Sequence, residues 1–392
     1  MTENMQQVIK KSADAVYIHI PFCKKICHYC AFNKYFYDGQ PVDQYLTGLD
    51  TEISQYQLNN TQTPVDTIYI GGGTPSCLSE VELNQLFDTI HRLIPFDEQT
   101  EFTFEINPGE LSLEKCQLLW DNGVNRISMG VQTFNDQLLR KIGRNHRIRH
   151  VYQSIDWLRQ VGFENLSIDL IFRLPGQTLE DFDDSLTKAL ELELPHYSLY
   201  SLIIEQKTLF QQLMREGKLP IPSEDVDADM FSLAVDRLKA HGIQQYEISN
   251  FAADGFQSRH NLKYWHSNDY YGFGAGAHGL LKGERYFNHG PVHHYLAQTQ
   301  QNKLPVIQRL PLDLNEQMEE YLFLALRTNQ GFSLRAFQES FKQDALILFG
   351  RFFQLEQAKQ LLVIEGDTVR LTTRGLFLAD TVFRDLIGWL KQ

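Results

Sequence analysis

The sequence is short of cysteine, of basic residues and of long apolar runs. Its 392 residues include five cysteines, and 36 Lys and Arg stand against 49 Asp and Glu, which gives a formal net charge of -13. This acidic balance disfavours a nucleic-acid partner, because phosphate neutralisation needs concentrated Lys and Arg. No apolar run approaches the ~20 residues that cross a bilayer, and residues 1–14 are polar and mixed in charge, so neither an integral membrane segment nor a secretory leader is predicted. We therefore expect a cytoplasmic protein.

Length and composition predict more than one folding unit. A chain of 392 residues exceeds the usual size of a single hydrophobic core. With 43% hydrophobic and 12% aromatic residues, it can bury one large domain and a smaller one.

Three of the five cysteines, Cys23, Cys27 and Cys30, fall within eight positions directly after a short apolar run. Without a leader, this spacing favours one metal centre over a disulfide framework. An iron-sulfur cube normally takes four thiolates, so three ligands on one loop leave one iron open. The alternative is a structural zinc site with His19 or His28 as the fourth ligand.

Short β-rich apolar runs alternate with longer amphipathic stretches, which indicates repeated β-α units around a parallel sheet. Six such units predict an open, partial (β/α)6 barrel. The predicted strands are residues 15–20, 65–70, 101–106, 125–130, 165–171 and 196–202, and the predicted helices are 42–57, 80–93, 112–121, 148–161, 179–190 and 225–240.

Polar or glycine-rich residues end or follow five of these strands. In β-α barrels the chemistry lies at the carboxyl ends of the strands, so we expect these residues to converge on one cavity. A triple glycine standing alone has the simpler explanation of a tight turn. The residues are the cysteine loop, Gly71-Gly-Gly-Thr74, Glu105 with Asn107, Gln132 and Asp169.

The sequence pattern changes at about residue 251. Residues 251–313 form an aromatic, Gly- and His-rich connecting segment. Its Gly272-x-Gly-x-x-Ala277 run looks like a dinucleotide fingerprint, but it neither follows a clear strand nor opens a helix. Residues 314–392 are helical and contain a hairpin signal, which predicts a small winged-helix-like domain of near-neutral charge. The three predicted parts are thus 1–250, 251–313 and 314–392.

Motifs along most of the chain carry a family resemblance. The C-x3-C-x2-C spacing resembles the radical S-adenosylmethionine (SAM) superfamily. From Tyr17 to about Asp380 the chain resembles the oxygen-independent coproporphyrinogen III oxidase-like family, and within it the HemW heme chaperones most closely. The matching runs are Ile70-Gly-Gly-Gly-Thr-Pro-Ser76, Glu105-Ile-Asn-Pro108, Asn125-Arg-Ile-Ser-Met-Gly-Val-Gln132, Gly143-Arg-Asn-His146, Asp169-Leu-Ile-Phe-Arg-Leu-Pro-Gly-Gln177, Tyr246-Glu-Ile-Ser-Asn250 and His260-Asn-Leu-Lys-Tyr-Trp265.

The resemblance implies a 4Fe-4S cluster on Cys23, Cys27 and Cys30, with SAM bound at the open iron. It places Tyr29 near the adenine and gives Glu105 the ribose hydroxyls. For Arg144 it leaves two roles open, pairing with a SAM carboxylate or a structural ion pair with Asp169. The implied SAM residues are Tyr17, Tyr29, Gly72, Gly73, Thr74, Glu105, Gln132, Arg144 and Asp169.

The resemblance also bears on the choice between chaperone and enzyme. The family's decarboxylating enzymes carry a further cysteine two residues after the third ligand, where this chain has Phe32, and a longer N-terminal extension than the sixteen residues before Tyr17. Both differences favour a heme chaperone. The alternative is a coproporphyrinogen III dehydrogenase, and a third is a radical enzyme acting on another substrate. No catalytic residue is assigned.

Heme is the third implied ligand. The candidates for its site are His260, Tyr264 and Trp265, since histidine is a common axial ligand of heme iron and aromatic rings pack on porphyrin. Equally open is a buried hydrogen-bond network around His260 that closes the barrel. His278, His293 and His294 are substitutes.

The implied partners are heme and heme-accepting proteins such as respiratory hemoproteins, while peripheral membrane contact and a dimer stay open. Two residues depart from the family pattern. Ala31 replaces an acidic residue, and Arg173 replaces a glycine at the end of the fifth predicted strand. We expect Arg173 to alter either the SAM pocket or the porphyrin-facing surface.

Overall fold

The computed structural model describes residues 13–61 and 63–391. Residues 1–12, over which the sequence predicts no leader, lie outside the described residues. Within the described ranges, no helix combines the length and apolar character needed to cross a membrane.

Nine of the described strands form one sheet, in the order β11-β1-β4-β5-β6-β7-β8-β10-β9, in which β11 is Tyr271–Phe273, β10 is Asn250–Ala252 and β9 is Gln244–Gln245. The strands from β11 to β8 run parallel, whereas β10 and β9 are antiparallel additions at the edge. The six predicted strands are all present, with ends shifted by two residues at most. They are β1 (Ala15–Ile20), β4 (Thr67–Gly72), β5 (Glu101–Ile106), β6 (Arg126–Gln132), β7 (Asn165–Phe172) and β8 (His196–Ser201).

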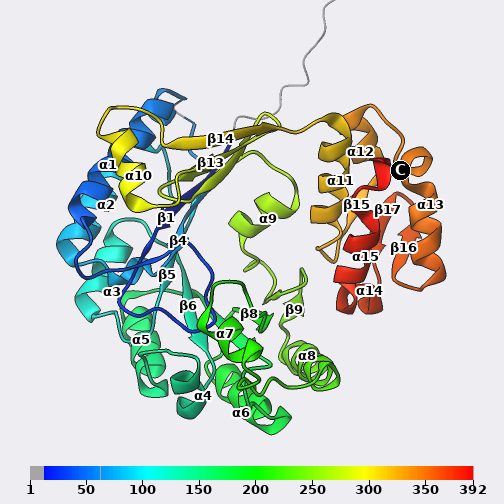
Figure 1. Cartoon of the computed structure of the whole chain (residues 1–392), viewed down its shortest axis with the longest axis horizontal. Helices are drawn as coiled ribbons and strands as arrows, with labels where there is room; N and C mark the ends of the chain where they lie inside the picture. Colours follow the sequence, from blue (N-terminus) through cyan, green and yellow to red (C-terminus); the bar gives the residue numbers. More distant parts are fainter. Residues whose placement is uncertain (1–12, 62, 392) are drawn as a thin grey trace, which may run out of the picture.

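Amphipathic helices cover the outer face of this sheet (Figure 1). Every second residue of β5, from Phe102 through Phe104 to Ile106, is buried in the apolar core that includes residues of these helices. The predicted helices occur as α1 (Val42–Tyr56), α2 (Glu80–Leu93), α3 (Leu113–Asp121), α5 (Ile148–Val161), α6 (Leu179–Leu190) and α8 (Glu224–Ala240), and the sequence missed α4 (Asp136–Lys141), α7 (Leu209–Arg215) and the 3-10 turns η1 (Leu58–Thr61) and η2 (Pro75–Cys77).

The segment 251–313 does more than connect two domains. Its strand β11 pairs in parallel with β1, so the chain returns to the first strand of the barrel. The sequence indicated no strand before the Gly272 run, and the structure shows that this run begins inside the three-residue strand β11. No helix follows directly, so this run still differs from a dinucleotide motif. The elements of this region are β9 (Gln244–Gln245), β10 (Asn250–Ala252), α9 (Arg259–Trp265), β11 (Tyr271–Phe273), β12 (His278–Leu281), β13 (Glu284–Asn288), α10 (Val292–Thr299) and β14 (Val306–Pro311).

The C-terminal region has an apolar core of its own, which runs from Met318 to Leu386. Its helices surround a small antiparallel sheet of order β15-β17-β16, and Figure 1 shows this unit beside the barrel, with α9 lying between them. This arrangement confirms the predicted barrel with a winged-helix-like domain, while the boundaries at 250 and 313 stay predictions. The elements are α11 (Leu314–Ala325), β15 (Phe332–Ser333), α12 (Leu334–Phe341), α13 (Ala345–Ala358), β16 (Leu362–Glu365), β17 (Thr368–Leu371), α14 (Thr373–Phe377), α15 (Ala379–Leu386) and η3 (Trp389–Lys391).

Candidate functional site

The loop between β1 and α1 carries the three clustered cysteines at the carboxyl end of the barrel strands. It includes the short parallel pair β2 (Phe22–Cys23) and β3 (Tyr35–Phe36). Cys23 is buried, and Cys27 and Cys30 are half-buried, all as free thiols. Thr74, which follows β4, donates a hydrogen bond from Oγ1 to Cys23 Sγ at 3.4 Å. The first cysteine thus lies against the glycine loop, as the sequence predicts for strand ends that converge.

A guanidinium lies beside the second cysteine. Arg144 Nη1 donates to Cys27 Sγ at 3.5 Å, and Nη2 donates to Asn107 Oδ1 and to the carbonyl oxygen of Gly130. Within the described part of the chain these are its partners, and Asp169 is not among them. The Nε atom of Arg144 is buried without a hydrogen-bond partner. Arg144 therefore retains one donor for a further group.

The described residues do not support a zinc site. His19 is hydrogen-bonded through both ring nitrogens, to Tyr17 OH and to the carbonyl oxygen of Asn33, at 2.9 Å each. His28 Nδ1 is hydrogen-bonded to the carbonyl oxygen of Lys141, which engages only one ring nitrogen and by itself does not exclude His28 as a metal ligand. Across residues 13–61 and 63–391, no three His, Cys, Asp or Glu side chains are grouped so as to hold one metal ion. An iron-sulfur cube differs, since each thiolate binds a different iron atom and the sulfurs need not meet at one point.

The triple glycine after β4 lets backbone and side chains approach closely. Gly72 has φ of +115°, and a Cβ there would lie 2.5 Å from the ring of His19. At Gly73 a Cβ would lie 2.7 Å from the carbonyl oxygen of Phe22. Packing within the protein therefore already requires both glycines, and their approach to SAM stays a prediction.

Two half-buried carboxylates face the interior of the barrel. Glu105 accepts hydrogen bonds from Tyr69 OH at 2.6 Å and from the backbone N–H of Gly72 at 3.1 Å. Asp169 accepts one from Ser128 Oγ at 3.3 Å. Burial, and then the charge of Asp169, raise the pKa of Glu105 to about 7, and burial also raises the pKa of Asp169. A positively charged ligand would relieve this cost.

The remaining predicted SAM residues surround these carboxylates. A β-bulge in β6 separates Gly130 from Gln132, and Gln132 has φ of +70°. Because a bulge redirects the side chains that follow it, its position here sets the direction of Gln132. Tyr17 lies on β1, and its ring centroid is 6.1 Å from that of Tyr69. Tyr29 packs near Phe210, with ring centroids 6.4 Å apart, and burial raises the pKa of its hydroxyl.

The predicted heme residues lie on α9, at the opposite end of the barrel. His260 is 1% exposed, and its ring nitrogens are hydrogen-bonded to Thr67 Oγ1 and Tyr264 OH at 2.8 Å each. Thr67 is the first residue of β4, whereas the glycine loop follows the last. Glu101, the first residue of β5, accepts from the backbone N–H groups of Arg259 and His260 at 2.9 Å. This arrangement is the buried network that the sequence left open, and heme ligation by His260 requires breaking one of these bonds.

Trp265 contacts the C-terminal domain. The guanidinium carbon of Arg327 lies 4.4 Å from the Trp265 ring centroid, and Arg327 Nη2 is 3.8 Å from Glu247, which is buried. The Tyr246–Asn250 and His260–Trp265 motifs thus meet the domain junction through Glu247 and Trp265. In contrast, His278, His293 and His294 are exposed.

Arg173 contacts residues outside the predicted SAM set. Its φ is +61°, its Nε donates to the carbonyl oxygen of Pro222 at 3.2 Å, and Nη1 lies 3.8 Å from Asp227. The side chain thus ties the end of β7 to the segment before α8 and the first turn of that helix. The exposed Ala31 lies on the cysteine loop.

The sequence analysis missed several polar residues of the barrel interior. Arg126, Thr103 and Asn165 lie on the same face as Glu105 and Asp169: Thr103 is two residues before Glu105 on β5, and Asn165 is four residues before Asp169 on β7. The signal was present, because polar residues alternate with apolar ones in β5 and β6, whereas parallel strands covered on both faces are usually apolar throughout.

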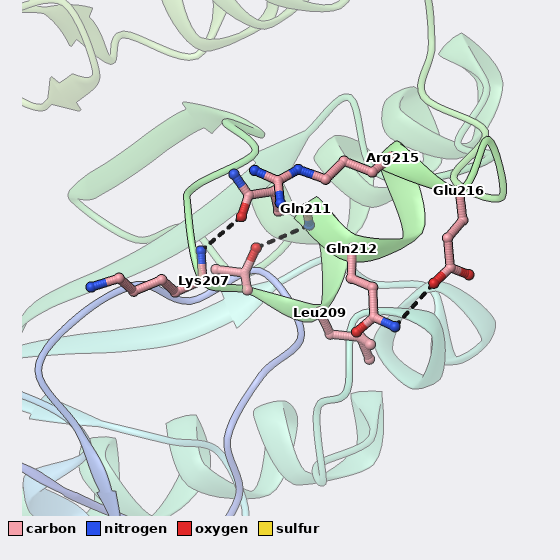
Figure 2. A pocket seen from close by; sticks show the side chains of 7 residues that line it. Lys207, Leu209, Gln211, Gln212, Arg215 and Glu216 are labelled. Carbon is pink, nitrogen blue, oxygen red and sulfur yellow. Dashed lines mark hydrogen bonds between the residues drawn. The ribbon is translucent and has the colours of Figure 1, made fainter.

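A surface hollow of about 710 Å³ lies over α7 and its flanking residues, and none of the predicted site residues lines it (Figure 2). Its polar side chains bond locally, for example Gln212 to Glu216 at 3.0 Å. Nearby Phe210 instead packs near His28 of the cysteine loop, with ring centroids 6.0 Å apart, and its N–H donates to the carbonyl oxygen of His28. The hollow is lined by Lys207, Thr208, Leu209, Gln211, Gln212, Arg215 and Glu216.

Comparison with known proteins gives two family matches. Residues 17–189 match the radical SAM superfamily, and residues 312–378 match the HemN C-terminal domain.

Individual relatives match over nearly the whole chain. The heme chaperone HemW of Bacillus subtilis (strain 168) is 46% identical over 377 residues, which cover 96% of this chain and 100% of that protein. HemW of Lactococcus lactis subsp. lactis (strain IL1403) is 44% identical, covering 95% of this chain and 97% of its own. The solved structure of coproporphyrinogen III oxidase (HemN) from Escherichia coli, a radical SAM enzyme, superposes with a TM-score of 0.85 at 22% identity, covering 96% of this chain and 90% of that one. At that identity the likeness shows the fold alone.

Proposed function

Because the chain belongs to the family of HemW heme chaperones, we propose that it binds a 4Fe-4S cluster, SAM and heme and passes heme to acceptor hemoproteins. The observation that carries this proposal is the 46% identity that extends over 96% of the chain. Proposed acceptors include respiratory hemoproteins.

Cys23, Cys27 and Cys30 would hold the cluster. Their free thiols, and the Arg144 guanidinium 3.5 Å from Cys27 Sγ, fit a site that carries negative charge on sulfur. When bound, the cluster supplies single electrons and an open iron for SAM. The loop backbone is held in place independently of the metal, since Tyr35 and Tyr37 donate N–H bonds to the carbonyl oxygens of Pro21 and Cys23.

The barrel interior fits SAM. Glu105 and Asp169 are half-buried acceptors whose pKa values are raised by desolvation, so they favour a ligand that brings hydroxyl donors and positive charge. The unpartnered Nε of Arg144 supports a SAM carboxylate as its partner over an ion pair with Asp169. Tyr17, Tyr29, Gly72, Gly73, Thr74 and Gln132 would complete the pocket.

Heme binding at His260, Tyr264 and Trp265 would require the His260 or Tyr264 side chain to move and one hydrogen bond to break, because both ring nitrogens of His260 are engaged. The exposed His278, His293 and His294 need no such movement. Comparing heme affinity of His260→Ala with that of His278→Ala and a His293→Ala/His294→Ala pair assigns the ligand. If heme affinity is lost in one of these variants alone, with its iron-sulfur cluster content unchanged, the histidine replaced in that variant is the ligand.

The decisive experiment uses the cluster-reconstituted chain under anaerobic conditions. Heme-loaded protein is mixed with apomyoglobin, and transfer is followed by the absorption of holomyoglobin against a control of free heme at the same concentration. In parallel, the chain is incubated with SAM, reductant and coproporphyrinogen III. Heme transfer without tetrapyrrole turnover supports the proposal, whereas formation of protoporphyrinogen IX makes the chain a dehydrogenase.

A further inference from the structure

Three neighbouring strands carry buried polar groups without partners at one level of the barrel interior. Thr103 of β5 is in register with Arg126 of β6, which is in register with Asn165 of β7. Residues in register on parallel strands project to the same face. Thr103 is 0% and Arg126 is 2% exposed. The atoms Thr103 Oγ1, Arg126 Nε and Asn165 Oδ1 are all buried without a hydrogen-bond partner.

The unpaired guanidinium is the most costly of these groups. In the described part of the chain, Arg126 Nε is buried without a hydrogen-bond partner and no carboxylate is paired with the guanidinium within 4 Å, although burial raises the pKa of Glu105 and of Asp169 and the charge of Arg126 acts at longer range to lower them. Buried charges are normally paired and hydrogen-bonded, because removal from water costs several kcal/mol. The nearby carboxylates already have other partners, since Glu105 accepts from Tyr69 and Gly72, and Asp169 from Ser128.

The groups toward the amino ends of the strands offer no negative charge to Arg126. Ser167 Oγ is hydrogen-bonded to His196 at 2.7 Å, and Tyr246 OH to the same imidazole at 2.9 Å. His260 is held by Thr67 and Tyr264. Glu101 lies at this end too, but its two oxygens accept from the backbone at the start of α9. The arrangement therefore leaves a positive group and hydrogen-bonding side chains on one face of the sheet, at one level beneath the proposed SAM site.

We propose that this part of the barrel interior is an anion site that binds one carboxylate group. Arg126 donates to the carboxylate in the fork geometry that guanidinium groups favour. The Thr103 hydroxyl adds a donor, and the Asn165 amide offers its N–H when its oxygen and nitrogen are exchanged. The carboxylate belongs either to a small free anion such as formate or to the propionate arm of a tetrapyrrole; the second source rests on the proposed heme function.

The test is formate binding to the cluster-reconstituted, SAM-loaded full chain, measured by calorimetry. Arg126→Gln keeps hydrogen-bonding groups but removes the charge, and we expect it to weaken formate binding more than about tenfold. Thr103→Val removes one donor and is expected to weaken it about fivefold. The matched control is Thr100→Val, since the Thr100 hydroxyl is buried but donates to the carbonyl oxygen of Val65 at 2.7 Å. Its formate affinity should equal that of the parent.

Heme and heme dimethyl ester distinguish the two sources. If heme but not its ester displaces formate, the propionate arm occupies the site; if neither does, the site takes a free anion. Either result supports the inference.

Equal formate affinity in the parent, Arg126→Gln and Thr103→Val, or no saturable binding by the parent, means that the space holds ordered water only and overturns the proposal. Should Arg126→Gln fail to fold, the comparison of Thr103→Val with Thr100→Val decides. Arg126-dependent formate binding without heme transfer would refute the chaperone function and leave this site standing.

Discussion

Replacing Arg173 by glycine and by alanine separates the conformational role of this residue from its side-chain contacts. The backbone at Arg173 is left-handed, with φ of +61°. Glycine adopts this conformation freely, whereas a residue with a Cβ pays about 1–2 kcal/mol. At an ordinary helical position the order is reversed, and glycine is about 1 kcal/mol less stable than alanine.

The expected magnitudes follow from the contacts of the side chain. Both variants lose the hydrogen bond to Pro222, which contributes about 1 kcal/mol. The pair with Asp227 at 3.8 Å, between side chains 27% and 24% exposed, contributes less than about 0.5 kcal/mol. Glycine avoids the energetic penalty of the left-handed conformation. Its greater conformational freedom, however, stabilises the unfolded chain by about 0.5–1 kcal/mol. We therefore expect Arg173→Gly to be within about 1 kcal/mol of the parent, and Arg173→Ala to be about 1 kcal/mol less stable than Arg173→Gly.

Thermal unfolding and SAM titration check this prediction together. A difference of about 1 kcal/mol corresponds to about 2 °C for a unit of this size, and SAM affinity should stay unchanged because the side chain points toward Pro222 and Asp227. The matched control is Arg159, on the exposed face of α5, where alanine should be the more stable variant. Equal stability of Arg173→Ala and Arg173→Gly, or a tenfold change in SAM affinity in either variant, would refute the reasoning.

Three further predictions concern the cluster, the pH dependence and α9. Cys27→Ser should reduce the iron content from roughly four atoms per chain to a trace. The control is Cys116→Ser, which should keep its iron because the Cys116 thiol is buried in the core. Equal iron content in both variants would remove Cys27 from the ligand set. Burial raises the pKa of Glu52 from 4.5 to about 7, so the folded chain binds this proton more tightly than the unfolded chain. The stability of the parent relative to Glu52→Gln should therefore fall by about 3 kcal/mol as the pH rises from 4.5 through 7. A difference in the free energy of urea unfolding that does not change with pH would contradict this prediction. His260→Ala should lower the free energy of unfolding by about 3 kcal/mol, because it leaves a cavity and leaves the Thr67 and Tyr264 hydroxyl groups without their partner. Tyr264→Phe removes one hydroxyl and should lower it by about 1 kcal/mol. Similar melting temperatures for the two variants would argue against the network.

The main elements of the barrel could be predicted because their signals are local. Apolar runs such as Ala15–Ile20 bury nearly every residue in the structure, and the polar residues after them meet because parallel strands share a carboxyl edge. Strand β11 was missed, since three residues in a glycine-rich segment show no periodicity. Its pairing with β1 joins residues about 255 positions apart, which no local pattern reports.

The sequence by itself determined the three-cysteine loop, the β-α alternation and the family. The location of His260 was decided by tertiary structure, because α9 is held by Thr67 and Glu101 at the amino ends of two distant strands. The row of Thr103, Arg126 and Asn165 was decided the same way. Strand register alone makes these residues neighbours, and burial alone turns an ordinary arginine into a charge that requires a partner.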